Sequence, residues 1–248
     1  MSEYILEIKD VTKAYPLGDG SSLTVLDHIN YSLPRGRVIM MMGRSGSGKT
    51  TLLNMMSTLD DATSGDIIMY DKVIKQGQHT KQKNEDESLP ASAEIRERVY
   101  SKMSQSEKDD LRRYRMGFVF QSVALIPVMT AYENVDFGLR TAGVKNASER
   151  DERIKEVLEK VGLADRAKHY PAELSGGERQ RIAIARAIAH HPEILFADEP
   201  TGALDTATGI GVAELFRSLT EEEGITVIMT THDPRMEEMA DMLIRMGQ

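Results

Sequence analysis

Short apolar runs bounded by turn residues recur along the chain and predict β-strands. Their ranges are Tyr4 to Ile8, Thr24 to Leu33, Val38 to Met42, Ile67 to Tyr70, Gly117 to Phe120, Ile194 to Ala197, Thr226 to Met229 and Met242 to Met246. In the second half these runs alternate with helical patterns and are apolar throughout, which is typical of strands buried on both faces of a parallel sheet. The pattern therefore indicates an α/β fold with a mostly parallel core sheet.

Amphipathic helices are indicated where apolar residues recur at helical spacing. The range Ser148 to Val161 carries its apolar residues on one face, with Ser148 and Asp151 at the spacing of a capping box. The range Thr208 to Glu223 repeats the pattern and ends before a glycine. Further helices are predicted over Thr51 to Ser57, Glu178 to His190 and, as a short piece, Glu94 to Met103.

One segment interrupts this alternation. Lys75 to Ser88, KQGQHTKQKNEDES, contains no aliphatic or aromatic side chain, so it cannot bury enough apolar surface to offset its ordering entropy. We expect an exposed, mobile loop there, within a polar insertion over about 72–106. The insertion is either a regulatory or partner-docking element or an inert solvated loop, and its composition favours the latter.

Composition excludes several classes of protein. The 248 residues include no cysteine, so a disulfide framework and a thiolate zinc site are excluded. The formal net charge of -8 argues against broad adhesion to nucleic acid, and no window approaches the length of a membrane-spanning helix. We expect one domain over 1–248 that is soluble by itself and reaches a membrane only through a partner.

A phosphate-binding motif follows the third apolar run. Gly43-Arg-Ser-Gly-Ser-Gly48-Lys49-Thr50 fits the pattern G-x-x-x-x-G-K-[ST] and lies between a predicted strand and a predicted helix, where that pattern forms a P-loop. Its glycines allow backbone amides to surround phosphates, Lys49 supplies a cation, and the Thr50 hydroxyl is a ligand for Mg²⁺. A chance glycine-rich turn is the alternative, and the strand-to-helix context argues against it.

Two adjacent carboxylates end a buried strand. In Ile194-Leu-Phe-Ala-Asp198-Glu199 the acids come at the carboxyl edge of the sheet, where open α/β sheets hold their ligands. Beside a P-loop, Asp198 is expected to hold Mg²⁺ directly or through water, and Glu199 to orient and deprotonate the attacking water. A strand that simply ends in a solvated turn is the alternative.

Leu174-Ser175-Gly176-Gly177-Glu178-Arg179-Gln180-Arg181 matches the signature motif of the ATP-binding cassette (ABC) ATPases, and the chain resembles that family from about Tyr4 to Met246. The serine hydroxyl and open glycine amides at a helix start form a second phosphate grip. In the family the signature of one subunit closes over the nucleotide on the other. The resemblance therefore implies a head-to-tail dimer of two copies with two ATP molecules between them.

Four further elements resemble the family in order along the chain. Tyr15 looks like the aromatic that stacks on adenine, and Gln121 like the glutamine that senses Mg²⁺ and links the core to a helical subdomain. Ala203-Leu204-Asp205 looks like the loop that communicates across the dimer, and His232 like the histidine that contacts the γ-phosphate. Each residue alone has an ordinary packing or surface alternative. His190 and His191 are interpreted as cations at a helix C-terminus, and the methionine runs as core fillers.

The resemblance implies the fold, the ligands and the complete site. The fold is a P-loop ABC cassette with an N-terminal antiparallel β-subdomain and P-loop core over about 1–120 and 178–248, and a helical subdomain over about 121–177. The implied cofactors are ATP and Mg²⁺. The implied nucleotide-binding residues are Tyr15, Gly43, Arg44, Ser45, Gly46, Ser47, Gly48, Lys49, Thr50, Thr51, Ser175, Gly176, Gly177 and Asp205. The implied catalytic residues are Lys49, Gln121, Glu199 and His232, and the implied Mg²⁺ ligands are Thr50, Gln121 and Asp198.

Within the family, the segments around Gln121, Asn134 and Asp205 look like the branch that serves lipoprotein release, macrolide export and related efflux. This resemblance implies an ATPase at the cytoplasmic face of the membrane, bound to a separate permease, with no nucleic acid expected. The alternative is a non-transport ABC ATPase that acts on DNA or ribosomes. The single cassette, without coiled-coil arms or cysteines, argues against it. A degenerate cassette that binds ATP only as a scaffold is disfavoured by the intact motifs.

Overall fold

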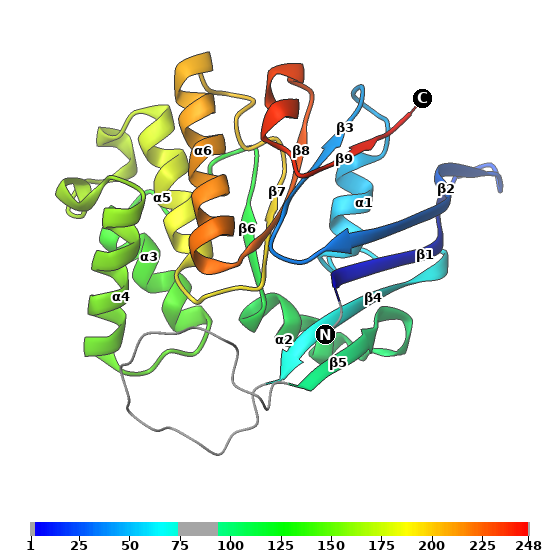
Figure 1. Ribbon diagram of the computed structural model, residues 1–248, viewed down its shortest axis with the longest axis horizontal. Helices are drawn as coiled ribbons and strands as arrows, with labels where there is room; N and C mark the ends of the chain where they lie inside the picture. The colour runs from blue at the N-terminus through cyan, green and yellow to red at the C-terminus, as the bar shows by residue number, and fades with distance from the viewer. Residues whose placement is uncertain (1–2, 74–93, 248) are drawn as a thin grey trace. The chain divides into compact units, whose positions relative to one another are not determined.

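The computed structural model describes residues 3–73 and 94–247, and the chain divides into two compact units. The antiparallel unit comprises Met1–Pro34 and Ala62–Met103, and the parallel unit comprises Arg35–Asp61 and Ser104–Gln248. Figure 1 shows the elements of both units along the chain. The mobile loop predicted over Lys75 to Ser88 lies outside the described residues.

The antiparallel unit contains a four-stranded sheet in the order β2-β1-β4-β5. Its elements are β1 (Tyr4–Pro16), β2 (Ser22–Pro34), β4 (Ser64–Val73), β5 (Glu94–Val99) and the 3₁₀ helix η1 (Tyr100–Lys102). The strands β1 and β2 are longer than the apolar runs that predicted them, because the antiparallel ladder also pairs polar residues such as Glu7 with Ser32 and Lys13 with Leu26. The predicted N-terminal antiparallel sheet is confirmed.

The short helix predicted over Glu94 to Met103 is wrong. Residues Glu94–Val99 form strand β5 instead, paired antiparallel with β4 through partners such as Ile68 with Val99 and Lys72 with Ile95. Glu and Arg have good helix propensity, but pairing with a strand distant in sequence overrides that local preference.

The parallel unit contains a five-stranded sheet in the order β6-β7-β8-β3-β9, and every neighbouring pair of strands is parallel. The strands are β3 (Val38–Met42), β6 (Met116–Val119), β7 (Ile194–Ala197), β8 (Thr226–Thr231) and β9 (Met242–Arg245). All residues of β3, β7 and β8 are buried, as their apolar runs predicted. The predicted α/β cassette fold with a parallel core sheet is confirmed, and Met40 to Met42 are core residues.

Helices accompany this parallel sheet (Figure 1). They are α1 (Lys49–Met56), α2 (Gln105–Tyr114), α3 (Ala131–Thr141), α4 (Ala147–Lys160), α5 (Gly176–Ile188), α6 (Thr206–Glu223) and the 3₁₀ helices η2 (Ala164–Arg166), η3 (Pro171–Glu173) and η4 (Pro234–Met239). Helix α5 contacts β6, α6 contacts β3 and β8, α1 contacts β8, and α3 and α4 pack against α5. The predicted helical subdomain over about 121–177 contains α3 and α4, which belong to the same compact unit as the parallel sheet.

Local capping begins several of these helices. Thr130 with Glu133 begins α3 and Ser175 with Glu178 begins α5, each by a capping box. The capping box predicted from Ser148 and Asp151 is wrong. Asn146 caps α4 instead, accepting a hydrogen bond from the Ser148 N–H at 3.0 Å. Asn146 and Ser148 are both of residue types that commonly cap helices, so spacing alone did not identify the cap.

The expectation that His190 is a cation at the end of α5 is also wrong. Burial lowers the pKa of His190 below its ordinary value, so at neutral pH the ring is uncharged. Its Nε2 lies 3.1 Å from the Met116 carbonyl oxygen. His191 is exposed and lies 3.7 Å from a Glu223 carboxylate oxygen. Only the tertiary contacts distinguish the two neighbouring histidines.

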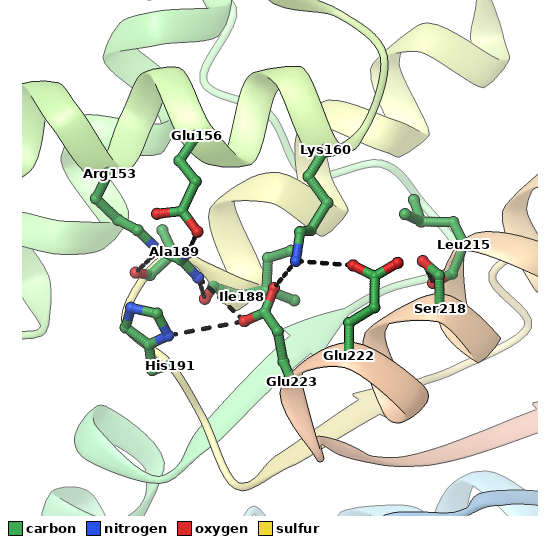
Figure 2. Close-up of polar contacts among 10 residues, drawn as sticks. All are labelled: Arg153, Glu156, Lys160, Ile188, Ala189, His191, Leu215, Ser218, Glu222 and Glu223. Atoms are coloured by element: carbon green, nitrogen blue, oxygen red, sulfur yellow. Dashed lines mark hydrogen bonds and ion pairs between the residues drawn. The ribbon is translucent and has the colours of Figure 1, made fainter. Parts of the chain in front are cut away.

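A buried arginine joins α4 to the ends of α5 and α6 (Figure 2). Arg153 on α4 donates to the Ile188 carbonyl at 3.1 Å and to the Ala189 carbonyl at 3.0 Å, which satisfies acceptors that the last turn of α5 leaves open. It also donates to Glu223, the last residue of α6, at 3.3 Å. Lys160, at the end of α4, donates to the other Glu223 oxygen at 2.7 Å.

Glu223 should make the free energy of unfolding depend on pH in the acid range. Burial raises the pKa of Glu223, but its contacts with His191, Lys160 and Arg153 outweigh burial and hold that pKa at about 2, below the unfolded value of 4.5. A depressed folded pKa gives stability that is complete above the unfolded pKa and is lost as pH falls from 4.5 toward 2. Glu223→Gln should lower the free energy of unfolding at pH 7 by about 1–2 kcal/mol, less than the full pKa difference because solvent screens the network.

Urea unfolding at pH 7, 4.5 and 3.5 measures this effect. Glu222→Gln is the matched control, because the Glu222 side chain is 59% exposed and lies 3.2 Å from the same Lys160. The control should change stability by less than about 0.5 kcal/mol. If the unfolding free energy of Glu223→Gln varied with pH as that of the wild type does, Glu223 would not be the source of the acid dependence.

Candidate functional site

The P-loop connects β3 to α1 and depends on its glycines. A Cβ at Gly43 would lie 2.6 Å from the Met246 carbonyl oxygen and 2.6 Å from Ser47 Oγ, so a side chain does not fit there. Gly46 and Gly48 have φ of 81° and 88°, a left-handed conformation that glycine adopts without strain. Gly48 lies directly before α1, so the loop turns sharply into the helix.

Lys49 lies inside this loop. Its side chain is buried, and Nζ donates to the Gly43 carbonyl at 2.8 Å and to the Arg44 carbonyl at 3.1 Å. Ser47 Oγ is buried and has no hydrogen-bond partner among the described residues. No atom of the described residues lies within 4 Å of a Cβ placed at Gly46, so one side of the loop is open. An enclosed cation, a free hydroxyl and an open backbone suit the binding of a phosphate group.

The carboxyl edge of the sheet brings Thr50 and Asp198 together. Thr50 Oγ1 donates to both Asp198 carboxylate oxygens at 3.2 Å. Thr230, buried on β8, donates through Oγ1 to Asp198 Oδ1 at 2.6 Å and accepts the Glu199 N–H at 2.8 Å. Thr230 was not predicted, although a threonine at the carboxyl end of an apolar strand beside β7 is the signal that could have identified it.

Glu199 is held between two side chains from other segments. Gln121 Nε2, two residues after β6, donates to Glu199 Oε2 at 3.2 Å. His232 Nδ1, directly after β8, lies 3.5 Å from Glu199 Oε1. The φ of Glu199 is 43°, a left-handed conformation that costs a residue with a side chain about 1–2 kcal/mol. The carboxyl ends of parallel strands therefore bring Gln121, Glu199 and His232 to one edge of the sheet. The backbone is strained at Glu199, whose carboxylate the other two side chains contact.

The oxygen atoms at this edge suit Mg²⁺. The Thr50 hydroxyl and the Asp198 carboxylate lie together and are hard ligands. Among the described residues no group of three or more His, Cys, Asp or Glu side chains could hold a metal ion. Two protein oxygen ligands fit the usual mode for Mg²⁺, in which one or two protein ligands are completed by phosphate oxygens and water.

The signature residues begin helix α5 at a second place in the parallel unit. Ser175 caps the helix by accepting the Glu178 N–H at 3.2 Å. Hydrogen bonds from the Ser175 backbone and side chain, with the Arg166 guanidinium, lower the pKa of Glu178 to about 2. A Cβ at Gly177 would lie 2.3 Å from Thr208 Cγ2, so only glycine fits against the first turn of α6.

Asp205 lies at the start of α6, the helix whose first turn meets Gly177. It caps α6 by accepting the Thr208 N–H at 3.1 Å and the Thr208 hydroxyl at 2.6 Å. A Cβ at Gly176 would lie 3.7 Å from Leu204 Cδ2, so Leu204 and Thr208 both meet the signature. In the described residues no hydrogen bond joins Ser175, Gly176 or Gly177 to the range 43–51. The structure therefore brings the signature to the start of α6, which Asp205 caps, and in the described residues no hydrogen bond joins it to the P-loop of the same chain.

The four remaining predicted binding residues are Arg44, Ser45, Thr51 and Tyr15. Arg44 and Ser45 are exposed on the P-loop, and Thr51 is half-buried in α1. Tyr15 is on β1 of the antiparallel unit, 38% exposed, with Lys13 Nζ 4.8 Å from its ring centre. Its role at adenine stays a prediction.

The sequence profile of the family described as ABC transporter matches residues 26–202. The chain belongs to the ABC transporter family. This ABC ATPase is 39% identical over 98% of its length to an uncharacterized ABC transporter ATP-binding protein of Methanocaldococcus jannaschii, of which it covers 95%. It is also 39% identical over 97% of its length to an uncharacterized ABC transporter ATP-binding protein of Thermotoga maritima, of which it covers 91%.

Solved structures agree with this assignment. The dimeric post-hydrolysis structure of the ATP-binding cassette MJ0796 bound to ADP and Pi has a TM-score of 0.77 and 35% identity, over 97% of this ABC ATPase and 94% of that chain. The cassette cbiO1 of Clostridium perfringens, described as part of the ABC transporter complex cbiONQ, has a TM-score of 0.78 and 26% identity, over 99% and 85%. Among the described residues of this ABC ATPase, no helix is both long and apolar enough to cross a bilayer.

Proposed function

We propose that this ABC ATPase powers export, or extrusion from a membrane, of a substrate through a separate permease. The observation that carries the proposal is the meeting of Thr50, Asp198 and Glu199 beside an intact P-loop, with Gln121 and His232 on the catalytic carboxylate. A degenerate scaffold would have no need of a strained glutamate contacted from two sides.

The proposed roles follow from this geometry. The P-loop and Lys49 bind the β- and γ-phosphates of ATP, and Thr50 and Asp198 hold Mg²⁺. Bound Mg²⁺ supplies positive charge against the phosphate oxygens. Glu199 accepts a proton from the attacking water, and Gln121 and His232 hold its carboxylate in position, because each contacts a different carboxylate oxygen.

The proposed active form is a head-to-tail dimer of two copies. The signature packs against Leu204 and Thr208 and makes no hydrogen bond to the P-loop of its own chain in the described residues, so its free amides are available to a nucleotide held by another copy. A cleft of about 660 Å³ borders the P-loop and is lined in part by Arg44, His232 and Arg245. The MJ0796 cassette is dimeric in its solved structures, which supports the same arrangement here.

The proposed permease contact lies over Gln121 to Val135. Val128, within this range, is 81% exposed, and Phe120 and Phe137, which flank the range, are each 44% exposed, so apolar side chains gather in this part of the sequence. The cbiO1 neighbour is part of a transporter complex, which supports a membrane partner. Through that partner we place the ATPase at the cytoplasmic face of the membrane, and the resemblance to the lipoprotein-release and macrolide-export branch favours export.

Affinity capture of the tagged chain from gently solubilised membranes of its native cells tests the proposal. We expect a stoichiometric permease with membrane-spanning helices, identified by mass spectrometry, and at least a tenfold loss of that permease with Val128→Glu. The control Ile210→Glu changes a 41% exposed apolar residue on α6 and should retain the permease. Ribosomal or DNA-repair proteins without a permease, in a preparation that hydrolyses ATP, would instead support the alternative non-transport function.

A further inference from the structure

The segment Gln121–Ile126 connects the catalytic carboxylate to the helices that follow it. Gln121, at its start, donates to Glu199 at 3.2 Å. The segment has no helical or strand structure of its own, so its conformation depends on the contacts made at particular residues. Two helices of the parallel unit provide such contacts.

Asn134 of α3 fixes the far end of the segment. Asn134 is fully buried, and its Oδ1 accepts the Ile126 N–H at 2.8 Å. Its Nδ2 donates to the carbonyls of Ile126, Met129 and Thr130 at 3.0–3.2 Å. One buried amide therefore holds the turn after the segment rigidly to α3.

Arg186 of the signature helix α5 holds the middle of the segment. Its Nη1 donates to the Ala124 carbonyl at 2.7 Å, three residues after Gln121. Helix α5 begins at the signature cap Ser175, so the same rigid element carries the signature at its start and Arg186 near its end. Arg186 therefore ties Ala124 to the helix that begins at the signature.

The surroundings of Arg186 leave it few other roles. Across residues 3–73 and 94–247 it forms no ion pair with a carboxylate, and burial lowers the pKa of its guanidinium. A partly buried cation without a counter-ion costs stability, so an apolar residue would serve packing at least as well. Gly138 of α3 makes room for it, since a Cβ there would lie 2.9 Å from Arg186 Cγ. The close approach of α3 restricts the arginine stem and aims its end at Ala124.

We propose that Arg186 is a positioning residue for ATP hydrolysis, which ties the Gln121 segment to the signature helix and thereby places Gln121 on Glu199. This inference rests on the proposed catalytic role of Glu199. Engagement of the signature with a nucleotide changes the position of α5, and Arg186 transmits that change to the segment. In this role Arg186 acts through Gln121 and not by contact with the reacting atoms.

The test compares Arg186→Met, Gln121→Ala and the double variant by steady-state ATP hydrolysis. Methionine keeps the length of the stem, removes the donor and leaves no buried charge, so the fold should be retained. We expect Arg186→Met to lower kcat at least tenfold with KM within threefold of wild type. If Arg186 acts through Gln121, adding Arg186→Met to Gln121→Ala should lower kcat by less than a further twofold. Arg186→Lys, which keeps a cationic donor, should give a kcat between those of wild type and Arg186→Met.

The matched control is Arg150→Met. Arg150 also donates to backbone carbonyls, those of Val144 at 3.1 Å and Lys145 at 2.9 Å, but not to the Gln121 segment. Its loss should lower the melting temperature, because the Asp136 carboxylate, which Arg140 and Arg150 each contact at 2.6 Å, loses one of these two partners. Its effect on kcat should be the same with and without Gln121→Ala. This control therefore distinguishes a general loss of fold stability from a loss of the positioning of Gln121.

Hydrogen exchange gives a readout that does not depend on activity. Peptides that span 121–130 should exchange at least fivefold faster in Arg186→Met than in wild type, and at the wild-type rate in Arg150→Met. Unchanged exchange, a wild-type kcat in Arg186→Met, or independent effects of Arg186 and Gln121 on kcat would each overturn the inference. Absence of hydrolysis by the wild-type chain would instead refute the proposed function, while the exchange result would still decide whether Arg186 holds the segment.

Discussion

Replacing Glu199 with Gln should abolish turnover while ATP still binds. Glutamine has nearly the shape of glutamate, so the contacts with Gln121 and His232 retain one polar partner each, but the amide cannot accept a proton from water. Loss of a general base lowers kcat by about 10²–10⁴-fold. Phosphate release measures kcat, and a fluorescent ATP analogue measures the dissociation constant, which should stay within threefold of wild type.

The matched control for this experiment is Glu214→Gln. Glu214 is exposed on α6, so it should keep the wild-type kcat. A Glu199→Gln protein that hydrolyses ATP at the wild-type rate would remove Glu199 from its proposed role. Slow turnover together with lost ATP binding would indicate instead that Glu199 supports the P-loop.

Replacing Lys49 with Ala should weaken ATP binding. The Lys49 ammonium is enclosed by the P-loop carbonyls of Gly43 and Arg44, where a phosphate would meet it with little competition from water. A hydrogen bond to a charged group contributes about 1.5–3 kcal/mol, which corresponds to a dissociation constant raised by about 10- to 100-fold. Isothermal titration with ATP and Mg²⁺ measures this constant.

Lys155→Ala is the control for the loss of a positive charge. Lys155 is an exposed residue of α4 that pairs with Asp151 at 2.6 Å, and its removal should leave ATP binding within twofold of wild type. A melting curve of Lys49→Ala without nucleotide separates lost binding from lost folding. An unchanged dissociation constant in the folded variant would refute the P-loop assignment.

Local sequence predicted the parallel unit well because its strands are buried on both faces. The runs Val38 to Met42 and Ile194 to Ala197 have the same bounds in the structure as in the pattern. Where burial is one-sided or pairing includes polar residues, the pattern was less informative. The sequence predicts a helix where strand β5 forms, because only the pairing of β5 with β4 determines its conformation.

Side-chain partners were harder to predict than motif positions. The P-loop, the Asp198–Glu199 pair and the signature are short contiguous segments whose chemistry is visible in the residue order. Thr230, Arg186 and Asn134 make hydrogen bonds to residues that lie 32, 62 and 8 positions away along the chain. The end of an apolar strand could have indicated Thr230, but nothing in the local sequence of Arg186 or Asn134 indicates their partners. Likewise His190 and His191 are identical in type and adjacent, but one is half-buried and the other exposed.

The sequence by itself determined the family, the parallel core and the residues that can carry phosphate chemistry, because these depend on residue type and spacing along short segments. Only the tertiary structure decided that Thr50 meets Asp198, that Gln121 and His232 contact opposite oxygens of Glu199, and that Arg186 reaches Ala124. Such contacts join segments far apart along the chain. They are set by the packing of helices and the register of parallel strands, which no local pattern encodes.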